Sequence, residues 1–294
     1  MEKYIHSFRD YLIVDKKSAK NTAESYIRDV IQFKEYCVSN GKNNLLKIER
    51  DFFYRYLEFL SFSGKSASTC SRVIASLRSF YKYLLINEHI KFNPLDGIKQ
   101  IKSEPKLPSI LEQKEVLALL SQPKGNDYKS IRDKAMLELL YATGIKVSEL
   151  IELKLSDINL QIGFLNLSGK SERIIPIYPN AVKSITNYIL NVRPIIVDGN
   201  HIDNLFTNMN GQPITRQGFW KIIKQYAADA KIKKEITPHT LRHSFAAHLL
   251  ENGAQLKDIK EMLGHSDISS AQVYAQLIKT KYTQNYAKFH PLAK

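Results

Sequence analysis

Residues 237–243 read Thr-Pro-His-Thr-Leu-Arg-His, and this stretch predicts where a helix begins. Thr237 is a typical N-cap residue, and Pro238 suits the first helical position, where its missing N–H leaves no hydrogen bond unmade. The helix is expected to extend to the Asn-Gly pair at 252–253. A second, short helix is predicted over residues 256–263 and ends at a glycine.

The first of these helices carries two side chains with catalytic chemistry. Because residues three apart share a helix face, His239 and Arg242 face the same way. Residues 263–267 read Leu-Gly-His-Ser-Asp, and Tyr274 follows His265 by nine positions. A tyrosine can attack phosphorus, arginine and histidine can hold the charge on phosphoryl oxygens, and histidine can move a proton. This ordered set predicts metal-free cutting of a phosphodiester through a phosphotyrosine, with no cofactor and no ATP.

Zinc binding is the alternative for the same helix. His239 and His243 have the i, i+4 spacing that can grip a metal ion. Arg242 would repel the cation, and no Glu or Cys stands nearby to complete the ligand set. We therefore expect no metal site, and we assign His243 and His248 to packing or capping.

A hairpin carries a further candidate. Residues 164–168 and 173–178 alternate like strands around a Gly-Lys-Ser-Glu turn at 169–172. Lys170 at its tip has the default role of a solvated turn lysine. In a functional role it reaches into a DNA groove and protonates the departing 5′ oxygen.

Composition indicates a DNA-binding protein of two domains. The chain has 294 residues, 44% hydrophobic and 24% charged, which is long enough for two packed cores. Its net charge is +14, shared as +6 over residues 1–100 and +8 over the remainder. A distributed positive charge suits a protein that contacts a polyanion from two sides. No membrane span or signal-peptide pattern is apparent, and two cysteines are too few for a disulfide framework.

The fold class we predict is mainly α: an N-terminal helical bundle followed by an α-rich domain with a small antiparallel sheet. Residues 103–110 contain two prolines and no helical period, so they read as a linker between domains at 1–102 and 111–294. Apolar side chains recur at helical spacing before the linker, in two sets: Tyr26, Val30, Phe33 and Cys37, then Ile74, Leu77, Tyr81 and Leu84. After it, residues 131–140 predict a helix that ends near Gly144.

One stretch of the N-terminal domain has a single sign of charge. No acidic residue stands between Glu58 and Glu88. A solvated helix face is the common meaning of such a run, but its length favours phosphate contacts. The candidate DNA-binding residues are Lys65, Arg72, Arg78 and Lys82.

These motifs together resemble a known family. Residues 132–294 are similar to the catalytic domain of the tyrosine site-specific recombinases of the phage-integrase family, and residues 1–100 to their core-binding domain. The full length and the ending His-Pro-Leu-Ala-Lys are most similar to the Xer branch. The resemblance implies a catalytic set of Lys170, His239, Arg242, His265 and Tyr274.

One catalytic position departs from the family pattern. Residues 142–150 read Ala-Thr-Gly-Ile-Lys-Val-Ser-Glu-Leu, and Lys146 stands where the family has an arginine. Lysine keeps the charge but loses the planar fork that holds two oxygens. The loss of one such donor typically slows a reaction by about a hundred- to a thousandfold. Either the chain is a natural variant with slow chemistry, or the lysine was introduced to trap a DNA complex. We favour the second explanation because the surrounding motif is intact.

The resemblance also implies partners and a role. The chain is expected to hold duplex DNA between its two halves, as a homo- or heterotetramer with a second recombinase, and to pass through a Holliday junction. The implied role is resolution of chromosome dimers at a dif-like site, controlled by the FtsK translocase. The implied location is the cytoplasm, in association with the nucleoid.

The alternatives are an integrase of a mobile element, a decayed DNA-binding protein and a metal-dependent nuclease. An integrase often has an extra arm-binding domain, whereas this chain begins directly with the core-binding helices. Residues 282–294, with Tyr286 and Phe289 as apolar anchors, are expected to dock on a neighbouring subunit.

Overall fold

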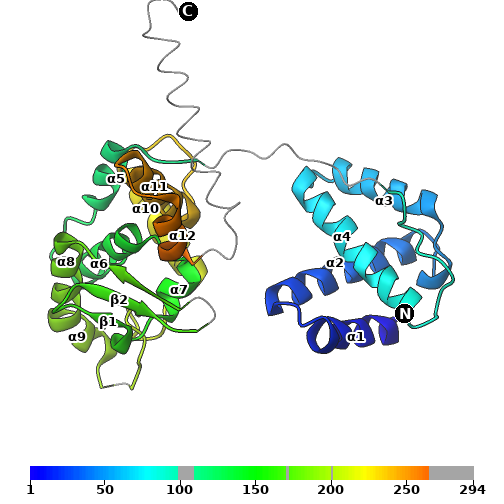
Figure 1. Ribbon diagram of the computed structural model, residues 1–294, viewed down its shortest axis with the longest axis horizontal. Coiled ribbons are helices and arrows are strands. Elements are labelled where there is room, and N and C mark those ends of the chain that lie inside the picture. Colours follow the sequence, from blue (N-terminus) through cyan, green and yellow to red (C-terminus); the bar gives the residue numbers. More distant parts are fainter. Residues whose placement is uncertain (99–108, 170–171, 200, 265–294) are drawn as a thin grey trace, which may run out of the picture. The chain divides into compact units, whose positions relative to one another are not determined.

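The computed structural model describes residues 1–98, 109–169, 172–199 and 201–264 (Figure 1). Its contacts divide the chain into two units, Met1–Pro105 and Lys106–Lys294. The described residues are mainly helical and include one three-stranded antiparallel sheet, which confirms the predicted fold class. None of their helices is long and apolar enough to cross a membrane.

The N-terminal unit is a bundle of helices packed on aromatic side chains (Figure 1). Its elements are α1 (Glu2–Asp10), η1 (Tyr11–Asp15), α2 (Lys20–Ser39), η2 (Leu45–Lys47), α3 (Arg50–Phe62) and α4 (Ala67–Ile86). Both predicted apolar stripes face this core, one on α2 and one on α4, and only Tyr26 among them is partly exposed. Phe33 lies 5.0 Å from Phe53 and 4.9 Å from Tyr56, measured between ring centroids.

The two cysteines belong to the same core. Cys37 and Cys70 are both buried and carry free thiols. Burial raises the pKa of the Cys37 thiol to about 12. A thiol with so high a pKa is not ionised near neutral pH, so Cys37 serves as a small apolar side chain.

The second unit is built around α6 (Tyr128–Thr143), against which α8 (Pro179–Asn191) and α11 (Pro238–Glu251) pack. The predicted apolar face of α6 is buried, but the opposite side is buried as well. Arg132 and Asp133 are within that buried surface and form an ion pair of 2.7 Å. A helix enclosed on all sides must satisfy its charges internally, and the Tyr226 hydroxyl donates a further hydrogen bond to Asp133 (3.1 Å).

The sheet confirms the predicted hairpin. Its strands are β1 (Ile158–Asn159), β2 (Phe164–Leu167) and β3 (Arg173–Pro176), in the order β1-β2-β3. Leu165 pairs with Ile175 on the buried face, and the last pair toward the turn is Leu167 with Arg173. The remaining elements are α5 (Gln113–Leu120), α7 (Val147–Glu152), η3 (Leu155–Asp157), α9 (Arg193–Val197), α10 (Arg216–Asp229) and α12 (Leu256–Leu263).

The predicted start of α11 and the predicted end of α12 are confirmed. The Thr237 N–H donates to the Thr240 hydroxyl (3.0 Å) at the start of α11, with Pro238 in the first turn. Gly264 ends α12 in the left-handed conformation, with φ of +62°. Both ends therefore follow from local sequence signals.

Gly144 brings the loop after α6 against α11. It adopts a φ of +59°, and a Cβ added there would lie 2.3 Å from Cδ1 of Phe245 on α11. Such a separation is too short for any side chain. The glycine thus ends α6 and allows the loop that carries Lys146 to approach α11 closely.

Candidate active site

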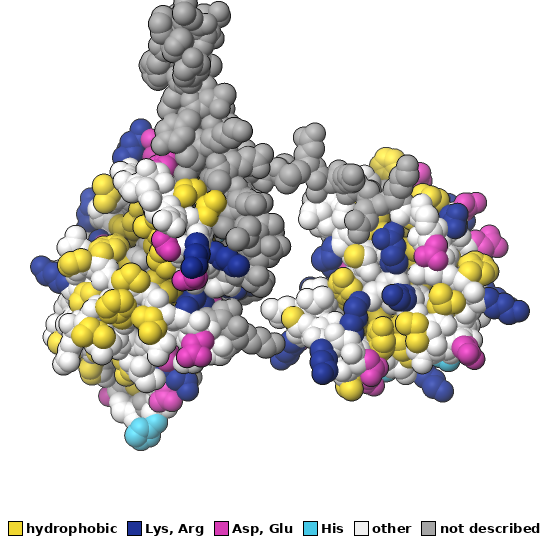
Figure 2. Space-filling model, viewed as in Figure 1, with side chains coloured by type: hydrophobic (Ala, Val, Ile, Leu, Met, Phe, Trp, Pro, Cys, Tyr) yellow, Lys and Arg dark blue, Asp and Glu magenta, His cyan; other side chains and the backbone are white. Residues whose placement is uncertain are grey.

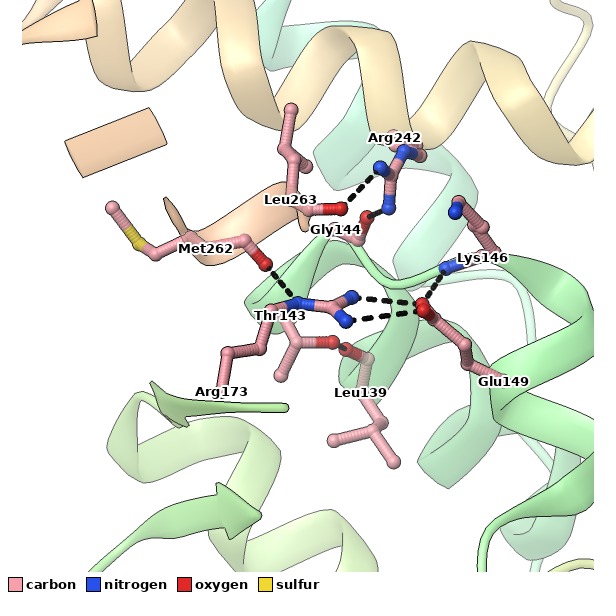
Figure 3. Close-up of polar contacts among 9 residues, drawn as sticks. All are labelled: Leu139, Thr143, Gly144, Lys146, Glu149, Arg173, Arg242, Met262 and Leu263. Atoms are coloured by element: carbon pink, nitrogen blue, oxygen red, sulfur yellow. Dashed lines mark hydrogen bonds and ion pairs between the residues drawn. The ribbon is translucent and has the colours of Figure 1, made fainter. Parts of the chain in front are cut away.

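Arg242 lies where the loop after α6 meets α11 and α12 (Figure 3). Only 4% of the residue is exposed. Its Nη1 donates to the carbonyl of Gly144 (2.6 Å) and its Nη2 to the carbonyl of Leu263 (2.6 Å). Two backbone acceptors on two different segments therefore fix the orientation of the guanidinium.

Lys146 is the N-cap residue of α7, and its side chain is exposed. The side chain extends toward α11, on the side where Arg242 lies (Figure 3). Its backbone N–H donates to Oε2 of Glu149 (2.7 Å), which fixes the start of α7. Lys146 and Arg242 both lie near enough to His239 to act on its imidazole.

His239 lies one helical turn before Arg242 and has a group of cations around it. The pKa of its imidazole is lowered, first by loss of hydration and then by the charges of Arg216, Arg242 and Lys146. A lowered pKa leaves the ring neutral at pH 7 and able to accept a proton. Positive groups gathered around a neutral histidine form a site for an anion such as a phosphoryl group.

Sequence reasoning missed three side chains of this region. Arg216 is the first residue of α10 and contributes to the field at His239. Arg173 donates from Nη1 to Oε1 of Glu149 (3.1 Å) and from Nη2 to Oε2 of the same side chain (2.8 Å). The spacing of Glu149 three residues after Lys146 signals a helix start. No local signal marks either arginine.

Three predicted catalytic residues, Lys170, His265 and Tyr274, lie outside the described residues. The described chain places their immediate neighbours. The ladder of β2 and β3 ends at Arg173, three residues after Lys170, and α12 ends at Gly264, one residue before His265.

The histidines set aside for packing have structural contacts. His248 is buried, and its Nδ1 lies 2.9 Å from the Tyr141 hydroxyl. The rings of His239 and His243 lie 6.3 Å apart between centroids. Within the described ranges, no three His, Cys, Asp or Glu side chains gather in a way that could hold a metal ion.

The four candidate DNA-binding residues divide into two kinds. Arg72 forms an ion pair with the buried Asp29, which also accepts a hydrogen bond from Ser76 (2.6 Å), and Arg78 donates to the carbonyl of Ile98 (2.7 Å). Both arginines therefore have contacts within the unit. Lys65 and Lys82 are exposed.

A buried, oriented arginine with a lysine and a neutral histidine beside it, on a mainly helical domain, defines a class of protein that acts on a phosphodiester. The comparisons with known proteins specify that class. The phage integrase family matches residues 109–281, and the phage integrase N-terminal SAM-like domain matches residues 5–88.

Two relatives are similar over the whole chain. Tyrosine recombinase XerD of Staphylococcus epidermidis is 42% identical over 295 residues, covering 100% of both chains. Tyrosine recombinase XerD of Halalkalibacterium halodurans is 43% identical over 292 residues, covering 98% of each. The chain therefore belongs to the phage integrase family, as a tyrosine recombinase that cuts and rejoins DNA.

Solved structures share the fold. The XerH recombinase bound to a palindromic difH substrate, in a post-cleavage complex, has a TM-score of 0.77 and 21% identity, covering 92% of this chain and 81% of that one. A lambda integrase tetramer bound to a Holliday junction has a TM-score of 0.71 and 18% identity, covering 93% and 76%. The two XerD relatives, rather than these structures, confirm the resemblance to the recombinase family and its Xer branch.

Proposed function

We propose that this chain resolves chromosome dimers by recombination at a dif-like site, with Tyr274 as the nucleophile. The observation that carries the proposal is the group of cations around His239, on a chain 42% identical over its full length to a XerD recombinase. The same proposal includes control by the FtsK translocase and assembly as a homo- or heterotetramer. It places the chain in the cytoplasm, associated with the nucleoid.

The described side chains supply the charge stabilisation of the reaction. Arg242 and Lys146 take the negative charge that builds on the non-bridging oxygens as the phosphorus becomes five-coordinate. Arg242 is oriented for this by its two carbonyl acceptors, and His265 is assigned to the same catalytic set by its motif. The exposed Lys146 ammonium provides one point charge in place of an arginine fork.

The proton transfers balance the covalent step. The Tyr274 hydroxyl oxygen forms a bond to phosphorus, and the bond from phosphorus to the 5′ oxygen breaks. The neutral imidazole of His239 accepts the phenolic proton, and the Lys170 ammonium gives a proton to the departing 5′ oxygen. The 3′-phosphotyrosine keeps the energy of the broken bond, so rejoining needs neither ATP nor a metal.

Lys146 favours a second candidate function, that of a DNA-binding protein with slow or lost cleavage. An integrase of a mobile element shares the chemistry and acts on a different DNA site. One experiment distinguishes an active recombinase from a DNA-binding protein that has lost cleavage. The chain is incubated in EDTA with a nicked suicide substrate carrying a dif-like site, and covalent adducts that survive boiling in detergent are counted. A complete absence of adducts at long times would favour the decayed protein.

DNA affinity is expected to fall steeply with salt. Lys and Arg side chains are scattered over both units on the face that Figure 2 shows, so contacts to phosphates should dominate binding. Each neutralised phosphate contributes roughly 0.9 log units of affinity per log unit of salt. The changes Lys65→Ala and Lys82→Ala are each expected to reduce that slope by about one contact, measured by titration of one duplex at several salt concentrations.

A matched control for these lysines exists in the same unit. Lys34 on α2 forms an ion pair with Glu2, so Lys34→Ala should leave the salt slope unchanged. An unchanged slope in Lys65→Ala and Lys82→Ala would remove both residues from the DNA interface. A chain without residues 1–105 is expected to bind the same duplex far more weakly.

We propose that residues 282–294 of one copy dock into an apolar hollow of a second copy. The hollow has a volume of about 380 Å³ and is lined by side chains of α6, α11, α12 and the segment after β3, including Tyr141, Ile177, Tyr178, Phe245, Leu249 and Met262. Tyr286 and Phe289 give the terminal segment two apolar anchors of suitable size. A lambda integrase of the same fold is solved as a tetramer bound to a Holliday junction, and contacts between copies are expected in a tetramer of this kind.

Deletion of residues 283–294 is expected to abolish cooperative binding to paired sites and to leave binding to a single site within about twofold. Cooperativity is measured by gel shift on one-site and two-site DNA. Leu249→Asp, which places a charge in the hollow, should produce the same loss. A mixture of the two variants should recover part of the cooperativity, because one supplies the segment and the other the hollow. Unchanged cooperativity in either variant alone rules out this docking.

A further inference from the structure

One side chain joins three segments of the second unit. Arg173, the first residue of β3, has a side chain only 7% exposed. It makes two hydrogen bonds to the carboxylate of Glu149 on α7, and its Nε donates to the carbonyl of Met262 on α12 (2.7 Å). Figure 3 shows the guanidinium between these two partners.

Each of the three segments carries a residue of the proposed catalytic set. Lys146 opens α7, and His265 follows the glycine that ends α12. Lys170 precedes Arg173 by three residues in the turn between β2 and β3. A single guanidinium therefore holds the base of the lysine hairpin to the elements of the phosphoryl site.

The Glu149–Arg173 pair is charged at neutral pH. Burial acts to raise the pKa of the Glu149 carboxyl, but the hydrogen bonds from Arg173 and from the Lys146 N–H outweigh it, so the pKa lies below its ordinary value. A bidentate pair between planar groups is directional, and a lysine cannot reproduce it. The pair thus fixes the orientation of Arg173 relative to Glu149 and also balances their two charges.

The other two segments are also joined to each other by contacts that do not involve Arg173. Arg242 already joins the loop before Lys146 to the end of α12, through the carbonyls of Gly144 and Leu263. The start of α7 is also fixed by the hydrogen bond from the Lys146 N–H to Glu149. Loss of Arg173 should therefore disturb Lys170 first.

We propose that Arg173 is a positioning residue for protonation of the leaving group: it fixes the base of the β2–β3 hairpin so that the Lys170 ammonium meets the departing 5′ oxygen. This inference rests on the proposed recombinase function. Arg173 itself does not touch DNA, because its guanidinium is buried against Glu149 and Met262. It acts by fixing the position of Lys170.

The test uses two DNA substrates that differ in one atom. In the first the scissile phosphorus carries the ordinary 5′ oxygen, and in the second this bridging atom is sulfur. A thiol has a pKa of about 8.5 and leaves as a thiolate without being protonated, so the second substrate needs no general acid. A defect in leaving-group protonation therefore disappears on the sulfur substrate, whereas a defect in nucleophile or charge stabilisation persists.

Arg173→Met is expected to slow single-turnover cleavage of the oxygen substrate by roughly 100-fold, the scale of a displaced general acid. On the sulfur substrate the rate should return to within about threefold of the unchanged chain. Lys170→Ala should show the same rescue, and Arg173→Lys should fall between Arg173→Met and the unchanged chain. His239→Ala should be slow on both substrates.

The controls distinguish a displaced Lys170 from a variant that fails to fold. Ile174→Ala changes the neighbouring residue of the strand, which is 65% exposed, and should behave like the unchanged chain on both substrates. Thermal unfolding and duplex affinity are measured for every variant, and Glu149→Gln gives a second route if Arg173→Met does not fold. Equal slowing of Arg173→Met on both substrates, or no slowing on either, overturns the proposal. Failure of the unchanged chain to form an adduct with either substrate would instead refute the recombinase function.

Discussion

Replacing Tyr274 with phenylalanine is expected to abolish the covalent adduct between this protein and DNA. The substitution removes one oxygen, the atom that forms the bond to phosphorus, so the proposed nucleophile is lost. Adduct formation on a nicked suicide substrate should fall below detection. Duplex affinity should stay within about twofold, because binding is spread over many phosphates.

The sixteen tyrosines of the chain offer a matched control. Tyr54 on α3 is 45% exposed, and Tyr54→Phe should form adducts at the unchanged rate. Adducts that persist in Tyr274→Phe would show that another tyrosine is the nucleophile, and peptide mapping of the adduct would identify it. Adducts lost together with duplex binding would mean that the substitution had disturbed the fold.

Lys146→Arg is expected to speed formation of the covalent complex by roughly two orders of magnitude. The structure places Lys146 exposed at the start of α7, with its side chain extending toward the α11 face that carries Arg242. An arginine there can hold two phosphoryl oxygens at once and restores one transition-state donor. The measurement is single-turnover cleavage of one DNA site.

The affinity for the same duplex should change by less than about 1 kcal/mol, because lysine and arginine carry the same charge. The fold should not respond either, since the contact of residue 146 with Glu149 is made by its backbone N–H. Lys146→Met removes the charge and should be slower than the unchanged chain. Equal cleavage rates for the lysine and arginine forms would place the catalytic arginine position elsewhere in the sequence.

Sequence reasoning succeeded where a signal lies within a few residues of its effect. Thr237-Pro238 opens α11, Gly264 ends α12, and the turn after residue 168 joins two antiparallel strands. Each depends on local backbone preferences, which neighbouring residues determine.

Sequence reasoning did not predict contacts between segments that are distant in the chain. Arg72 was predicted as a DNA contact from the sign of its neighbours, and that prediction is untested; its ion pair with Asp29, 43 residues earlier on another helix, had no local signal. Arg173 and Glu149 are 24 residues apart, and no periodicity connects a strand end to a helix start. The burial of α6 on all sides depends on which helices surround it, and that is a property of the whole fold.

Arg242 is oriented by two backbone carbonyls of its own chain, so the direction of its guanidinium does not depend on a ligand. One of those carbonyls belongs to α12, an eight-residue helix whose core is a small cluster of Phe245, Ala246, Ile259 and Leu263. Short elements with few buried contacts open locally at a lower free energy than a central core does. With Arg242 in its proposed role, we expect the rate of strand cleavage to depend on the local stability of α12, so that warming reduces activity before the unit around α6 unfolds.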